Sequence, residues 1–393
     1  MEVLVWRNKG VQVPITRRWS LLNLIFLLGT LGLALVLVPM VFAHSLEHWG
    51  AWVVFLVMVA TIGMSVTCGY HRLFSHRAYQ ARWPVRLFLL CFGAASFENS
   101  ALQWASDHRI HHRLVDQNDD PYNSRKGFWY AHWIWVMEER TLPISGVGDL
   151  EKDPLVRWQH RHHFLIGAVA ASLLPLLVGI WTHDLLGCLI IGVLLRIVVT
   201  HHTTFFINSA AHFYGTQPYS DANSARDNAF LAPLTYGEGY HNYHHMWQWD
   251  YRNGVKWYQW DPAKWAIKSM AWAGLASGLR AVPDPMIRRA RIKMEEKALL
   301  ARLAQAPPLA AEKLLTRVQC ARQRLDQALL ALQEHREAWD RRKAERKALR
   351  QEAWARGKAE WKEATDQRKR EFKLAWGEWK AARLEVRRVA FAS

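Results

Sequence analysis

Four long apolar stretches without a single carboxylate occupy the first half of the chain and set its fold class. Residues 21–43, 49–70 and 164–181 carry no charged residue, and residues 185–206 carry one arginine, Arg196. Each stretch is long enough to cross a hydrocarbon core of about 30 Å as a helix. The first is too long for a signal peptide and lacks its small-residue cleavage site. The sequence therefore predicts an all-α integral membrane protein with four transmembrane helices.

The distribution of basic residues predicts the orientation of these spans. The short connections at 45–48 and 182–184 contain no Lys or Arg, whereas four bases precede the first span: Arg7, Lys9, Arg17 and Arg18. Because basic loops stay on the cytoplasmic side, both termini and residues 71–160 are expected there. Residues 86–104 are also apolar but contain Glu98 and Asn99, so we interpret them as a re-entrant or interfacial helix.

Charge divides the chain into three parts. Residues 286–393 hold 28 Lys+Arg and 15 Asp+Glu, a net charge of +13 out of +17 for the whole chain. We therefore expect a cytoplasmic N-terminal segment at 1–20, a membrane domain at 21–285 and a basic helical tail at 286–393. In the tail, Pro307 and Pro308 separate a short helix from a long one running to about residue 388. Three roles stay open for it: a solvated helix or weak coiled coil, a helix lying on anionic lipid, or a dock for an acidic electron donor.

Histidines, not cysteines, carry the chemistry of this sequence. The four cysteines show no CxxC spacing, which argues against a disulfide framework, a zinc ribbon or an iron–sulfur cluster. Three histidine boxes lie on the predicted cytoplasmic side: HxxxxH at 71–76 and HxxHH at 108–112 and 241–245. Positions i, i+3 and i+4 share one helix face, so each HxxHH offers three imidazoles together, and Asn208 and His212 pair at i, i+4. The i, i+5 spacing of His71 and His76 diverges around an α-helix, which suits a helix end or two neighbouring metals.

The nine imidazoles of these segments exceed what one ion can bind and suit two. Imidazole binds zinc, copper, nickel and iron alike, so the ligand type alone does not choose the metal. Zinc would give hydrolysis or structure, whereas two redox-active irons could use O2. A metal site directly beneath an apolar helix bundle could act on a lipid chain inserted between the helices. A methylene of that chain offers no group for acid–base catalysis, so attack on it requires an oxidising metal.

Five segments, in this order, resemble the membrane-bound stearoyl-CoA (delta-9 acyl-CoA) desaturases over about residues 20–280: HRLFSH, DHRIHH, DPYNSRKGFW, NSAAHFYG and GEGYHNYHH. The resemblance implies two iron ions and O2-dependent removal of two hydrogens, which leaves a cis double bond. It also implies a metal-bound water held by Asn208, and no catalytic residue beyond the metal ligands. The iron ligands it implies are His71, His76, His108, His111, His112, His212, His241, His244 and His245.

The same resemblance implies a set of substrate contacts. Asn99 and Asp107 would contact the CoA moiety, Glu98 and Thr204 would shape the bend of the acyl tunnel, and Val59 and Gly63 would close its end. Four bases of this chain remain to meet the phosphates of the carrier: Arg109, Arg113, Arg125 and Lys126. The chain departs from the family at Glu98, which replaces a glutamine, and at Ser106, which replaces a basic residue. The carrier could therefore be CoA, acyl carrier protein or an intact lipid, with CoA as first choice.

Carboxylates flank the boxes and could accept hydrogen bonds from the imidazoles: Asp107, Asp116, Asp119, Asp120 and Glu238. An aromatic run at 247–265 suits the lipid headgroup level, so we expect contact with membrane lipids and none with nucleic acid.

The sequence thus predicts O2-dependent desaturation of a fatty acyl thioester at a di-iron centre. Because the chain has no electron-carrier motif, electrons would come from a cytochrome b5-like or ferredoxin-like donor with its reductase. The nearest alternative is a fatty acyl hydroxylase or related oxygenase; a zinc transporter or storage protein and a recruiting scaffold are others. The composition favours a bacterial cytoplasmic membrane with the active site facing the cytoplasm. Double-bond position, chain length and oligomeric state stay open.

Overall fold

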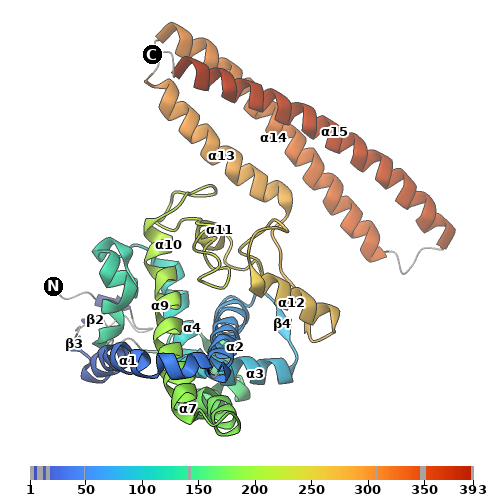
Figure 1. Ribbon diagram of the computed structural model, residues 1–393. Coiled ribbons are helices and arrows are strands. Elements are labelled where there is room, and N and C mark those ends of the chain that lie inside the picture. Colours follow the sequence, from blue (N-terminus) through green and yellow to red (C-terminus); the bar gives the residue numbers. More distant parts are fainter. Residues whose placement is uncertain are drawn as a thin grey trace. The chain divides into compact units, whose positions relative to one another are not determined.

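The chain is almost entirely helical in this computed structural model, which describes residues 4–6, 12–14, 18–47, 49–139, 143–305, 308–345 and 351–390 (Figure 1). Within these residues, four helical segments are long and apolar enough to cross a membrane: Leu21–Glu47, Gly50–Ser75, Pro154–Trp181 and Leu185–Phe213. They confirm the four predicted spans. The third begins ten residues earlier than expected, because Asp153 caps it and Pro154 occupies its first position.

Two of the four spans contain π-helical turns. The first and third are single α-helices, α1 (Leu21–Glu47) and α7 (Pro154–Trp181). The second is α2 (Gly50–Met64) continued by the π-helix η1 (Ser65–Ser75). The fourth consists of α8 (Leu185–Leu189), the π-helix η4 (Ile190–Leu195), α9 (Arg196–Asn208) and α10 (Ala210–Phe213).

Shorter elements connect the spans. The helical ones are α3 (Trp83–Ala94), α4 (Ala101–Leu114), η2 (Ser124–Lys126), η3 (Tyr130–Ile134), α5 (Trp135–Met137), α6 (Gly148–Glu151), α11 (His241–Met246) and α12 (Pro262–Trp272). Six very short strands pair antiparallel: β1 (Leu4–Trp6) with β2 (Gln12–Pro14), β3 (Arg18–Trp19) with β5 (Glu138–Glu139), and β4 (Gln80–Ala81) with β6 (Ala276–Ser277).

The apolar segment 86–104 is broken rather than continuous. Helix α3 ends at Ala94, and Phe97 and Asn99 have positive φ angles of 59° and 70° before α4 begins at Ala101. Helix α4 then packs against η1, so the second histidine box lies beside the first.

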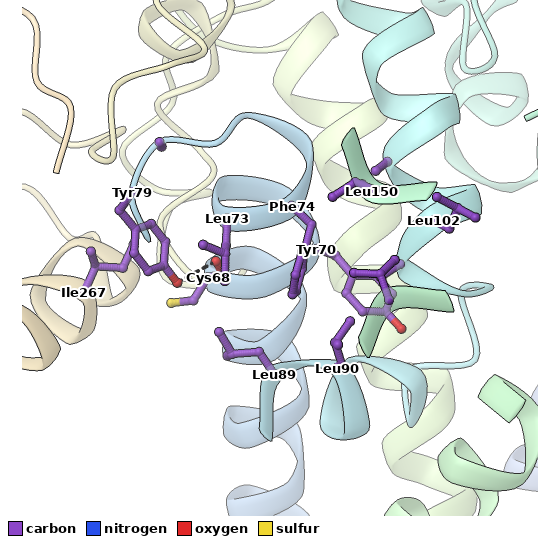
Figure 2. Close-up of a cluster of buried hydrophobic side chains, with 14 of the residues drawn as sticks. Cys68, Tyr70, Leu73, Phe74, Tyr79, Leu89, Leu90, Leu102, Leu150 and Ile267 are labelled. Carbon is purple, nitrogen blue, oxygen red and sulfur yellow. Dashed lines mark hydrogen bonds between the residues drawn. The ribbon is translucent and has the colours of Figure 1, made fainter. Parts of the chain in front are cut away.

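A buried apolar cluster fixes the end of the second span (Figure 2). Tyr79 donates a hydrogen bond to the Cys68 carbonyl at 2.9 Å, and Ile267 of α12 packs into the same cluster. Leu89 and Leu90 of α3 close it from another side. This packing holds η1, and with it His71, in one orientation.

The chain divides into two compact units, residues 1–217 with 221–281 and residues 218–220 with 282–393. The second unit contains α13 (Asp284–Leu303), α14 (Pro308–Glu345) and α15 (Gln351–Ala390). Arg317 and Arg324 of α14 pair with Glu385 and Glu378 of α15, so these two helices run antiparallel. The expected single long helix is therefore wrong. The helices pack together because each of them alone would leave an apolar stripe exposed to water. Packed together, they bury a shared apolar core that contains Ile292, Leu299, Leu303, Leu314, Val318, Leu325, Leu329, Trp379 and Val386.

Candidate metal centre

The nine histidines of the predicted set lie in two neighbouring groups. Within each group, one potential ligand atom per residue lies within 4.8 Å of the others. The first group is His71, His76, His108, His112 and His244; the second is His111, His212, His241 and His245. Seven of these side chains are fully buried and two are partly buried.

The Nε2 atoms of the imidazoles point at one another. In the first group, Nε2 of His71 lies 2.9 Å from that of His244, and Nε2 of His76 lies 2.9 Å from that of His108. In the second, His241 lies 3.1 Å from His212 by the same atoms. Two nitrogen lone pairs this close repel unless a proton or a metal ion is shared between them, so the arrangement is compatible with a metal ion in each group.

Burial keeps these rings in the form that binds metal. It lowers the pKa of His108, His112 and His244 well below the ordinary histidine value, and the neighbouring imidazoles lower it further. A neutral imidazole offers its lone pair to a metal, whereas a protonated one does not.

The π-helix η1 brings together the histidines of the first box. In a π-helix the backbone hydrogen bond joins residues i and i+5, and the His76 N–H donates to the His71 carbonyl at 3.1 Å. The two rings lie 4.7 Å apart and belong to one group. The helix end expected at this box is present, since η1 ends at Ser75. The expectation that the His71 and His76 side chains diverge around an α-helix is wrong.

Each HxxHH box contributes to both groups. On α4, His108 and His112 face the first group and His111 the second. On α11 the assignment is reversed, with His244 in the first group and His241 and His245 in the second. The two helices therefore cross-link the two sites, and neither site forms without both.

Hydrogen-bonded partners hold the outer nitrogens of three of the rings. His71 Nδ1 lies 3.2 Å from Glu238, and His111 Nδ1 lies 2.8 Å from Asp120. His212 Nδ1 lies 2.7 Å from Ser224 Oγ. Such contacts fix ring orientation and raise ligand basicity. Glu238, Asp120 and Asp116, which binds Ser224, were candidates from sequence; Ser224 was not, since no spacing rule connects it to a box.

A buried ion pair supports Glu238 from the other side. Arg72 contacts the Glu238 carboxylate at 2.9 Å and Asp261 at 3.0 Å, with all three side chains buried. Burial raises the pKa of Glu238, but His71 and Arg72 lower it more, so its net pKa lies well below the ordinary value.

A cavity of about 430 Å³ opens beside both groups and is lined by His71, His108 and His241. Six of the residues assigned to substrate or water also line it: Gly63, Glu98, Asn99, Asp107, Thr204 and Asn208. Val59, Arg125 and Lys126 are not part of this lining. Asn99 is exposed and Gln103 and Asp107 are half-buried, so this side is the mouth of the cavity.

Two further residues of the cavity wall escaped the sequence reasoning. The Trp104 ring stacks on His108 at 4.7 Å and its Nε1 donates to Glu98 at 3.3 Å. The sequence could have predicted the contact of Trp104 with His108, because residues four apart share one face of a helix. Burial raises the pKa of Glu98 to about 7, against opposing hydrogen bonds from Thr204 and Trp104. Tyr236 was the other, and nothing in its local sequence marked it.

Three further polar side chains in or near the spans contact protein groups. His201 Nε2 lies 2.7 Å from the Ser96 carbonyl, and Arg196 donates to the Ala95 carbonyl at 2.7 Å. His160 Nδ1 lies 2.7 Å from Ser100 Oγ. These contacts agree with a structural role for the histidines outside the boxes.

The fold and the site define a membrane protein with four apolar spans and two neighbouring histidine groups, each able to hold a metal ion, beside a cavity. Residues 47–276 match the model of the family described as fatty acid desaturase. This chain belongs to the fatty acid desaturase family.

Named relatives agree with this assignment. A probable acyl-CoA desaturase of Schizosaccharomyces pombe is 41% identical over 285 residues, which cover 72% of this chain and 59% of the relative. Acyl-CoA desaturase 1 of Saccharomyces cerevisiae is 42% identical over 256 residues, 64% of this chain and 50% of the relative. Stearoyl-CoA desaturase 5 of Homo sapiens is 35% identical over 298 residues, 73% of this chain and 85% of the relative. The chain thus spans little more than half the length of the two yeast relatives.

Proposed function

We propose that this protein desaturates a fatty acyl chain, leaving a cis double bond, with delta-9 as the position. The observation that carries the proposal is the pair of histidine groups in the wall of a cavity that reaches Gly63, about two turns before His71 on the second span. Making one double bond removes two hydrogens from the chain. Reduction of O2 to two waters uses these with two protons and two electrons from outside, and a cytochrome b5-like or ferredoxin-like donor with its reductase would supply the electrons.

Two irons held by the nine histidines would supply the oxidising chemistry that an unactivated methylene requires. The chain's own residues then have distinct tasks. Glu238 and Asp120 fix the orientation of His71 and His111 through their Nδ1 atoms. Trp104 packs over His108 and covers this part of the wall, and Asn208, which also lines the cavity, would hold a water.

The substrate we propose is an acyl-CoA. The acyl-CoA names of the relatives support it, and Asn99 and Asp107 at the mouth of the cavity would meet the carrier. Arg125 and Lys126 lie outside the cavity lining and are the proposed phosphate contacts beyond the mouth. The positive-inside bias supports a cytoplasmic active site. The bacterial membrane rests on composition alone, since the relatives described above are fungal and human.

Expression in cells that cannot make unsaturated fatty acids tests the proposal. We expect new monounsaturated chains by mass spectrometry, lost in His111→Ala and retained in His162→Ala, whose histidine is exposed and outside both groups. Hydroxylated chains instead of monoenes would make the protein the oxygenase named as the nearest alternative. Unchanged lipids together with bound zinc would overturn desaturation.

A further inference from the structure

One face of helix α12 is buried against the end of the second span that carries the first histidine box. Ala263 and Ile267 are fully buried, and Ile267 packs into the same apolar cluster as Cys68 and Leu73 of η1 (Figure 2). The Cys68 thiol contacts the Ala263 carbonyl at 3.9 Å. Helix α12 is therefore fixed beside the end of a span.

The opposite face of α12 is exposed and carries aromatic rings and a base. Trp265, Lys268 and Trp272 are all exposed, and Trp272 is 78% exposed. Their spacing of i, i+3 and i+7 places them on one helix face. Lys268 Nζ lies 5.9 Å from the centre of the Trp272 ring, so the base and the ring are neighbours.

The paired strands β4 and β6 extend this face to the start of α3. The Arg82 N–H donates to the Leu275 carbonyl at 2.9 Å, three residues after α12 ends. Arg82, Trp83 and Leu275 are exposed, and Trp83 is 67% exposed. We call the following exposed residues the α12 face: Arg82, Trp83, Trp265, Lys268, Trp272 and Leu275.

The exposed charges along this part of the chain are positive. Of residues 251–281, all of which the structure describes, one is acidic, Asp261. Its carboxylate is fully buried, where it caps α12 by accepting a hydrogen bond from the Lys264 N–H at 2.9 Å. Lys256 and Arg280 add two further exposed bases to this segment. Within these described residues, bases and apolar rings are therefore exposed without a competing carboxylate.

This combination of side chains fits a lipid surface. Tryptophan rings favour the headgroup level of a bilayer, and Lys and Arg beside them attract anionic headgroups. The second span has 26 residues and is longer than a hydrocarbon core of about 30 Å, so its last turns would reach the headgroups. Because α12 packs against those turns, its outer face would meet the headgroups as well.

We propose that the α12 face binds the headgroups of anionic phospholipids, with Arg82 and Lys268 contacting the phosphates and the three tryptophans packing between the lipids. This inference goes beyond the proposed desaturation and does not depend on it. It predicts two separable contributions to lipid binding. The bases select anionic over zwitterionic lipid, whereas the rings strengthen the binding of both.

Native mass spectrometry of the purified full-length protein, titrated with phosphatidylglycerol or with phosphatidylcholine, measures the affinity for each lipid. We expect the wild type to bind phosphatidylglycerol more tightly. The double variant Arg82→Gln/Lys268→Gln should lose roughly 10–30-fold in affinity for phosphatidylglycerol, because each base near an anionic surface contributes about fivefold. Its affinity for phosphatidylcholine should not change. The double variant Trp265→Ala/Trp272→Ala should bind both lipids more weakly, by similar factors.

Two controls separate the α12 face from general charge and from a site for soluble phosphate. The double variant Arg341→Gln/Lys343→Gln removes the same charge from exposed positions of α14 and should bind both lipids like the wild type. Glycerol phosphate, which has the phosphate of the headgroup but no acyl chain, should not displace phosphatidylglycerol. Because all the altered side chains are exposed, the variants should keep the wild-type unfolding midpoint.

Three outcomes would overturn the proposal. Equal affinities of the wild type for the two lipids would exclude selection of anionic lipid and favour a protein partner for this face. An equal loss in the α12 and α14 charge variants would assign the effect to net charge. Displacement by glycerol phosphate would indicate a soluble phosphate site instead of a lipid surface. None of these results would affect the proposed desaturation, which the lipid analysis of expressing cells tests separately.

Discussion

Asp116 accepts two hydrogen bonds from Ser224, one from its backbone N–H at 2.7 Å and one from its hydroxyl at 2.5 Å. The Ser224 oxygen also lies 2.7 Å from His212 Nδ1. With its own proton directed to Asp116, the hydroxyl oxygen is free to accept from the imidazole. This chain of contacts joins a loop carboxylate to a proposed metal ligand 96 residues away in sequence.

Ser224→Ala should therefore weaken metal binding without removing a ligand. Loss of an outer hydrogen bond to a ligating histidine costs roughly 10–100-fold in metal affinity. Competition of the purified protein with an iron chelator measures this. Ser277→Ala changes an exposed serine of β6; it is the matched control and should compete like the wild type. Equal affinities of all three proteins would show that Ser224 does not support the site.

Arg72→Met should strongly destabilise the protein. The change leaves the Glu238 and Asp261 carboxylates buried without their cation, which costs about 3–5 kcal/mol of unfolding free energy. Thermal unfolding in detergent should show a large drop in midpoint. Arg77→Met is the control, because Arg77 is exposed and 3.8 Å from Asp149; such a pair contributes less than about 1 kcal/mol. Similar midpoints for the two variants would contradict a stabilising role for the buried pair.

Glu98 should make stability depend on pH near neutrality. Burial raises its pKa to about 7 in the folded protein, from an ordinary value near 4.5. The protonated carboxyl is the favoured form, so its stabilisation is complete below about pH 4.5 and is lost as pH rises through about 7. Between pH 5.5 and 8.5 the unfolding midpoint of the wild type should fall, by an amount equivalent to roughly 1–3 kcal/mol. Glu98→Gln mimics the neutral form and should show a smaller fall; an identical pH dependence would exclude Glu98 as its source.

The division of neighbouring histidines between two groups predicts site-selective metal loss. His111 and His112 are adjacent in sequence, yet they belong to the second and the first group. If each group holds one ion, either alanine variant should retain about one iron per chain where the wild type retains about two. Elemental analysis of purified protein gives the ratio. Loss of all iron in both variants would indicate a single coupled site.

This division marks the limit of what the sequence could predict. Apolar runs longer than a bilayer is thick predicted all four spans. The spacing of the boxes selected eight of the nine clustered histidines, and the pairing of Asn208 with His212 selected the ninth. Spacing could not predict the π-helical turns that bring His71 beside His76, since they depend on how η1 packs. Ser224 and Tyr236 contact residues distant in sequence, Asp116 and Gly63 respectively, and local sequence patterns do not predict such pairs.

The tail shows the same limit. Its helix-forming composition predicted helices, but the antiparallel packing of α14 and α15 depends on pairs of residues distant in sequence, such as Arg324 and Glu378. Several tryptophans of the tail have contacts within the unit. Trp379 is fully buried, and Trp339 and Trp361 stack at 4.1 Å across the two helices. A helical bundle with its own core accounts for these rings without a lipid surface.

Residues 282–393 should therefore fold as a separate helical unit. Expressed alone, they should give a helical circular dichroism spectrum and one cooperative urea transition, because the unit has its own buried core. Trp379→Ala removes the largest buried side chain and should cost about 3–5 kcal/mol. Leu374→Ala, at a position on the same helix that is 71% exposed, should cost less than about 0.5 kcal/mol. A fragment without a cooperative transition, or equal effects of the two variants, would mean that the tail needs the membrane unit in order to fold.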